Sequence, residues 1–181
     1  MLFETWGAND DEVRGAVVGD DLVPSARLTA TRAITIDAPP SAVFPWLRQM
    51  GFGRAGWYSY DWIDNLGRRS AEVILPEWQQ VGTGDVIPGG GPVGFEVARA
   101  DEPHALVLRL ASTGGVSGRI GFSLAYDLRD RDGSTRLVSR VRARVDLPGG
   151  RLIERGLLGP GDGIMVRRQL LNLAERATQN G

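Results

Sequence analysis

The second half of the sequence constrains the fold most, because its apolar pattern changes from the period of a strand to the period of a helix. Residues 94–101, 104–112, 117–128 and 134–147 alternate apolar and polar side chains, which predicts four β-strands. Asp132-Gly133 between the last two is a strong hairpin signal. Residues 160–179 then carry an apolar stripe at helical spacing, formed by Val166, Leu170, Leu173 and Ala177. An antiparallel sheet needs one covered face, and a long C-terminal helix can cover it.

The first half supplies one more strand and two short helices. Residues 28–39 predict a strand that ends at Pro39, and Ser41 is the expected cap of a helix through Met50. Ser59 is the expected cap of a second short helix that ends at Gly67. Residues 1–27 predict an irregular arm with one short helix near 11–17. We therefore predict a single α+β domain over 1–181, in which a curved antiparallel sheet wraps around the C-terminal helix and 1–27 form an N-terminal arm.

The residue inventory excludes several classes of enzyme. The chain has no cysteine and no lysine, so thiolate nucleophiles, Schiff bases and a Walker A loop are absent. His104 is the only histidine, which leaves too few ligands for a typical zinc site, and we expect neither metal nor cofactor. The net charge of −1 gives no field that attracts nucleic acid. The N-terminus lacks the features of a secretory signal and no apolar run is long enough to span a bilayer, so we expect a cytoplasmic protein. The oligomeric state cannot be read from the sequence.

The stretch GWYSYDWIDNLG, residues 56–67, is the richest in aromatic side chains. It supports two interpretations: the aromatics seat a short helix on the sheet, or some of them line a ligand cavity. Asp61 is the best candidate for a catalytic acid or base, because burial between two aromatic neighbours would raise its pKa. Asp64 has the same ambiguity. The ligand-binding candidates from this stretch are Trp57, Tyr58, Tyr60, Trp62 and Asp64.

Three further residues are candidates for the cavity. Trp78 could border its entrance, and Met165 on the C-terminal helix is either core or cavity wall. Arg109 interrupts an apolar strand, so it either faces solvent or enters the cavity to meet an anionic group of the ligand. The last strand carries a row of arginines that could form a patch for nucleic acid or lipid: Arg136, Arg140, Arg142 and Arg144. We predict instead that the row lies on a solvated convex face, where carboxylates on neighbouring strands neutralise it.

The chain resembles the SRPBCC/START/Bet v 1-like helix-grip superfamily, in its bacterial polyketide cyclase/dehydrase-like branch. The resemblance lies in TRAITIDAPPSAVFPWLRQMG (31–51), GRAGWYSYDWIDNLG (53–67), VGTGDVIP (81–88) and MVRRQLLNLAERA (165–177). It implies a cavity for an apolar molecule between the curved sheet and the C-terminal helix, closed at one end by the two short helices. Residues 57–65 would then lie near the cavity. The superfamily has no shared catalytic motif to transfer.

Two functions of different class are compatible with these observations. The first is binding of a hydrophobic or aromatic small molecule, of lipid or polyketide type, without metal. The second is an enzyme similar to polyketide cyclases and aromatases, which uses Asp61 or a tyrosine as acid or base and obtains most of its rate from orientation and excluded water. A third possibility is an interaction subunit whose cavity is filled by side chains.

Overall fold

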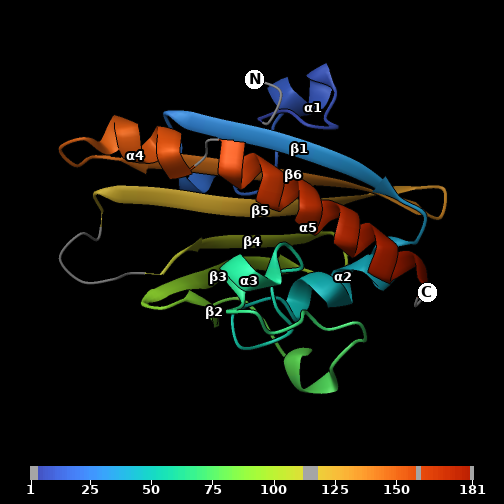
Figure 1. Ribbon diagram of the computed structural model, residues 1–181. Coiled ribbons are helices and arrows are strands. Elements are labelled where there is room, and N and C mark those ends of the chain that lie inside the picture. Colours follow the sequence, from blue (N-terminus) through green and yellow to red (C-terminus); the bar gives the residue numbers. More distant parts are fainter. Residues whose placement is uncertain (1–3, 112–117, 158–159, 180–181) are drawn as a thin grey trace.

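A six-stranded antiparallel sheet forms the body of the protein. The computed structural model describes residues 4–111, 118–157 and 160–179. The strands are β1 (Leu28–Ile36), β2 (Val86–Gly90), β3 (Val93–Asp101), β4 (Ala105–Leu110), β5 (Ile120–Arg131) and β6 (Ser134–Val145), in the spatial order β1-β6-β5-β4-β3-β2. The long helix α5 (Pro160–Gln179) lies across one face of this sheet, and α4 (Gly150–Leu157) precedes it (Figure 1). The predicted fold class, an α+β fold with a curved sheet around a C-terminal helix, is confirmed.

The β5–β6 hairpin sets the register at the centre of the sheet. Arg131 pairs with Ser134, so the loop between the strands has only two residues. Both have positive φ angles, 51° at Asp132 and 89° at Gly133, as a type I′ turn requires. The predicted hairpin is therefore present, and this turn fixes which side chains of β5 face α5.

The main core lies between the sheet and the helices. From α5, Leu170, Leu173 and Ala177 are buried against apolar side chains of β4, β5 and β6. The helix α2 (Pro40–Arg48) adds the buried Phe44 and Trp46. It begins one residue before the predicted cap Ser41, because a proline fits the first turn of a helix without losing a hydrogen bond.

The second short helix is shorter than predicted. α3 (Asp61–Asp64) has a single turn and begins after Tyr60 rather than at Ser59. Leu66 and Gly67 have φ angles of 52° and 78°, which ends the helix. The other short elements are the 3-10 helices η1 (Asp20–Leu22) and η2 (Pro76–Trp78).

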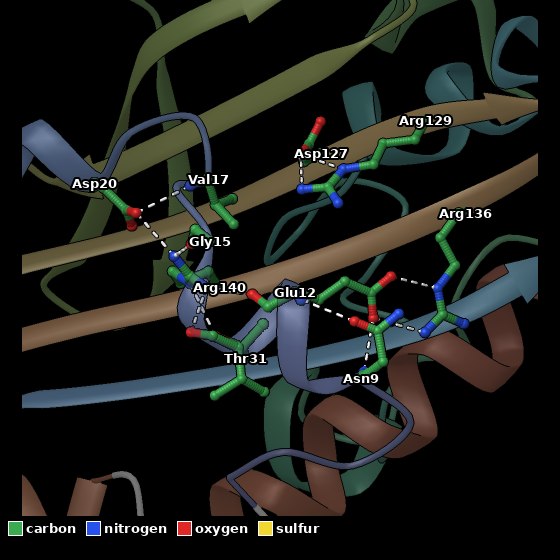
Figure 2. A network of polar contacts seen from close by, with 11 residues as sticks. Asn9, Glu12, Gly15, Val17, Asp20, Thr31, Asp127, Arg129, Arg136 and Arg140 are labelled. Atoms are coloured by element: carbon green, nitrogen blue, oxygen red, sulfur yellow. Dashed lines mark hydrogen bonds and ion pairs between the residues drawn. The ribbon is translucent and has the colours of Figure 1, made fainter.

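The outer face of the sheet is covered by the N-terminal arm, which contains α1 (Asp10–Arg14) and η1 (Figure 1). Val17 of the arm is buried against Val107 and Val138 of the sheet. The arginines of β6 hold the arm in place (Figure 2). Arg136 forms two hydrogen bonds of 2.8 Å with the carboxylate of Glu12, and burial of this pair keeps it away from competing water.

Arg140 is the most deeply buried of these arginines, with 3% of its surface exposed. Its guanidinium donates to Asp20 Oδ2 at 2.8 Å and to the backbone oxygens of Gly15 and Glu12 (Figure 2). Arg142 donates to the backbone oxygen of Val23. The prediction of a solvated arginine face is therefore wrong. The row does lie on the outer face and does meet carboxylates. Glu12 and Asp20, which pair with the first three arginines of the row, belong to the arm, and the arm excludes water from this part of the row. Arg144 pairs instead with Asp146, just after β6.

No helix in the part of the chain that the structure describes is long and apolar enough to cross a bilayer.

Candidate functional site

A largely apolar pocket opens between the sheet, the N-terminal half of α5 and the segment that leads into α3. Its volume is about 220 Å³. The sheet supplies part of the lining, and the remaining residues come from the segment 57–64 and from α5. The lining residues are Trp57, Ser59, Asp64, Gly89, Phe95, Phe122, Leu124, Met165, Val166 and Gln169.

Three aromatic rings form one continuous wall of the pocket. Trp57 and Phe95 meet edge to face, with ring centroids 5.6 Å apart, and Phe95 meets Phe122 at 5.7 Å. Gly89 makes room for this arrangement, since a β-carbon at that position would lie 2.7 Å from the Phe95 ring. The wall is thus built from side chains of two strands and of the segment before α3.

Buried amides fix the position of Trp57. Gln169 of α5 donates to the Trp57 backbone oxygen at 2.9 Å and accepts from the Tyr126 hydroxyl at 2.8 Å. Asn172, one helical turn later, donates to the backbone oxygen of Tyr58 at 2.7 Å. Together these bonds fasten residues 57 and 58 to the helix, so one wall of the pocket is held rigidly.

The sequence reasoning did not select Gln169 or Asn172. The available signal was two amides three residues apart beside the apolar stripe of the helix. On a buried helix face such groups need hydrogen-bond partners, and here the partners are the backbone oxygens of the aromatic segment.

Tyr58 lies in the core beneath the pocket and does not line it. Its ring is fully buried and packs edge to face on Trp46. Its hydroxyl accepts a hydrogen bond from Gln49 at 2.7 Å, and burial raises the pKa of this hydroxyl above its usual value. A tyrosine in this state stays protonated, so its role is in packing.

Asp61 makes a different set of contacts from those of Asp64. Its carboxylate accepts from the Ser70 amide at 3.0 Å and from the Ser70 hydroxyl at 2.5 Å. The Ser70 hydroxyl in turn accepts from the Tyr58 amide. Asp61 therefore closes the loop between α3 and residue 70, and it borders a separate, mainly polar hollow that includes Glu72 and Arg168.

Asp64 places a carboxyl group in the apolar pocket. Both of its side-chain oxygens and the hydroxyl of Ser59 are buried, and none has a hydrogen bond of regular geometry within the described residues. Burial raises the pKa of Asp64 to about 6; the neighbouring Asp61 charge raises it further, whereas Ser59 partly opposes the change. Asp64 is thus a titratable group poised near neutral pH at a ligand-sized hollow.

The other sequence candidates lie apart from this pocket. Trp62 is 73% exposed, and Trp78 packs under the guanidinium of Arg54, 4.7 Å from its ring centroid. Tyr60 is half-buried at the start of α3 and does not belong to the lining. Of the predicted ligand-binding residues, Trp57, Asp64 and Met165 line the pocket.

Arg109 points to the outer face of the sheet. Its neighbours Leu106 and Leu108 belong to the core under α5, whereas Arg109 alternates to the opposite side. Its side chain is 50% exposed and pairs with Glu96 of β3 at 2.6 Å. The expectation that it could reach an anionic ligand in the cavity is corrected by this placement.

The described residues contain no group of three or more side chains suited to hold a metal ion. Among the polar side chains of the described lining, Gln169 is engaged by the protein at both ends of its amide. Asp64 and Ser59 retain capacity to bind a polar group of a ligand. Such an arrangement can bind an apolar body and one polar group, and it can hold or move one proton at the carboxylate.

Comparison with known proteins identifies the fold. No protein-family model matches the sequence, and no curated protein matches it significantly. Among solved structures, protein MLL2253 from Mesorhizobium loti superposes with a TM-score of 0.51 at 12% identity, over 85% of this chain and 99% of that one. Protein Ms6760 from Mycobacterium smegmatis has a TM-score of 0.49 at 15% identity, over 84% and 92%. A norcoclaurine synthase from Thalictrum also has a TM-score of 0.49, at 13% identity over 84% and 92%. The six-stranded antiparallel sheet with the long helix α5 across one face is the helix-grip fold that the sequence resemblance implied.

Proposed function

We propose that the protein binds a small hydrophobic or aromatic molecule in the pocket between α5 and the sheet. The observation that carries this proposal is the wall of three aromatic rings around a hollow of about 220 Å³. Burial of apolar ligand surface against such a wall is the dominant source of affinity, at roughly 25 cal/mol per Å² before the costs of association.

The pocket volume sets the size of the ligand. An apolar cavity of about 150 Å³ holds one benzene molecule. The pocket here is larger by about one half, which suits one ring with a short chain or two fused rings. A larger ligand would have to extend through the pocket's mouth.

The alternative function is an enzyme without metal or cofactor that moves a proton on the bound molecule. The observation in its favour is the carboxyl group in the pocket, whose burial raises its pKa towards neutrality. The contacts favour Asp64 over Asp61 for this role. Asp64 lines the apolar pocket, whereas the carboxylate of Asp61 already accepts two hydrogen bonds from Ser70. Binding is the simpler proposal, since it needs only the apolar wall.

Calorimetric titration with naphthalenemethanol tests the binding proposal. Val166 lines the pocket, so Val166→Phe places a larger side chain in the hollow and should abolish saturable binding. Val86 on β2 is exposed and lies outside the lining, so Val86→Phe makes the same chemical change without filling the pocket. Binding to the wild type and to Val86→Phe, with loss in Val166→Phe, is the expected result. Equal binding by all three proteins would place the ligand elsewhere and contradict the proposal.

A further inference from the structure

The pocket contains an acidic side chain, Asp64, that no charged group among the described residues neutralises. None of the ion pairs in the described residues involves Asp64. Its two oxygens are shielded from water and have no hydrogen bond of regular geometry to a described residue, although the Ser59 hydroxyl and the backbone amide of Asp64 lie close enough to lower its pKa slightly. A buried carboxylate without a counter-charge destabilises the fold, so its presence in a ligand-sized hollow points to a partner supplied from outside the chain.

The chemistry of that partner follows from what Asp64 lacks. An ionised carboxylate only accepts hydrogen bonds, and its strongest partner is a positively charged N–H donor. The nearby Ser59 hydroxyl can donate one bond, but it carries no charge. A cation in the pocket would also meet the faces or edges of Trp57, Phe95 and Phe122, and the faces of aromatic rings attract cations.

We propose that the natural ligand is an organic amine, whose ammonium group pairs with Asp64 while its apolar or aromatic body packs on Trp57, Phe95 and Phe122. This inference rests on the proposed function and names the class of ligand for the same pocket. The raised pKa of Asp64 is consistent with it, because an unpaired buried carboxyl group is held partly neutral until a cation arrives.

The same geometry selects against anionic ligands. A fatty acid or another carboxylate would bring a second negative charge towards Asp64, and no arginine among the described lining residues compensates for it. Arg109, the arginine that the sequence suggested for this purpose, lies on the outer face of the sheet. The pocket therefore distinguishes an amine from an acid of equal size by charge as well as by fit.

The test compares two probes that differ in one group, naphthalenemethylamine and naphthalenemethanol, by titration followed in NMR spectra at pH 7.5. In the wild type, the amine should bind at least about 10-fold more tightly than the alcohol, as a charged hydrogen bond predicts. In Asp64→Asn, which keeps the shape of the side chain and removes its charge, that advantage should fall to within about 2-fold. The control Asp37→Asn removes one charge from an exposed side chain outside the pocket lining and should retain the full advantage.

Each outcome separates the two proposals. If the alcohol binds the wild type as tightly as the amine, or more tightly, the amine inference is overturned and the proposed function stands. If the amine keeps its advantage in Asp64→Asn, a different group binds the ammonium and the inference is again overturned. If neither probe binds the wild type, the proposed function itself fails. The wild-type comparison does not depend on whether the variant folds, and the NMR spectrum of Asp64→Asn reports directly on its fold.

Discussion

Replacement of Asp64 by asparagine should change how the free energy of unfolding depends on pH. In the folded protein burial raises the pKa of Asp64 from 3.8 to about 6. Between these two values the folded state binds more protons than the unfolded state, so stability falls as the pH rises. The penalty is nearly absent below about pH 3 and complete above about pH 7.

The size of this effect follows from the difference between the two pKa values. Two pKa units correspond to at most about 3 kcal/mol. Asp64 is partly exposed, and solvent screening reduces the expected penalty to about 1–2 kcal/mol. Asp64→Asn has no charge to bury, and about a third of the wild-type penalty is already present at pH 4.5. The stability of Asp64→Asn relative to the wild type should therefore increase by about two thirds of this amount, or about 1 kcal/mol, between pH 4.5 and pH 7.5.

Urea denaturation at several pH values measures this difference directly. Titrating groups remote from Asp64 are present in both proteins and cancel in the comparison. Asp37→Asn makes the same chemical change at an exposed position outside the pocket and serves as the matched control. Parallel stability curves for the wild type and Asp64→Asn would mean that Asp64 ionises as it does in water, and would refute the argument that the pocket desolvates it.

Two other predictions concern the arm and the pocket wall. Glu12→Gln breaks the buried pair with Arg136 and should lower the free energy of unfolding by about 3 kcal/mol. Asp10→Asn, in an exposed pair, should lower it by less than about 1 kcal/mol. Urea denaturation compares the two variants, and equal small losses would show that the arm is not held by the Glu12–Arg136 pair. Gly89→Ala forces the Phe95 ring to move and should weaken naphthalenemethanol binding several-fold. In the control Gly82→Ala, the added methyl group meets no atom within 4 Å, so the affinity should be unchanged. Calorimetry measures both affinities, and an unchanged affinity in Gly89→Ala would argue against Phe95 as part of the site.

The sheet and the long helix could be predicted because their patterns are local. Alternation in β4, β5 and β6, the Asp132-Gly133 turn and the stripe on α5 each follow from a short run of residues. The arginine row of β6 was placed on the correct face, but nothing in its spacing indicates that the arm returns to cover it. That contact joins residues more than a hundred positions apart, such as Glu12 and Arg136.

The site was predictable in its region but not in its detail. Of residues 57–65, Trp57, Ser59 and Asp64 line the pocket. Local sequence does not determine whether Asp61 or Asp64 enters the pocket. The difference arises from Ser70, nine positions after Asp61, whose amide and hydroxyl donate hydrogen bonds to the Asp61 carboxylate. The same limit applies to Arg109. The alternating pattern of its strand places Arg109 opposite the leucines, but only the assembled sheet shows which of the two faces is the outer one.

The central claim is that the pocket beside Trp57 binds a small apolar molecule. The chain has five tryptophans, and their indole N–H signals can be followed separately in a nitrogen-labelled sample titrated with naphthalenemethanol. We predict a saturable shift of the Trp57 signal, assigned by the Trp57→Phe variant, with little change at the exposed Trp62 or at Trp78 beside Arg54. A Trp57 signal that stays in place, or shifts concentrated at Trp62, would contradict the claim.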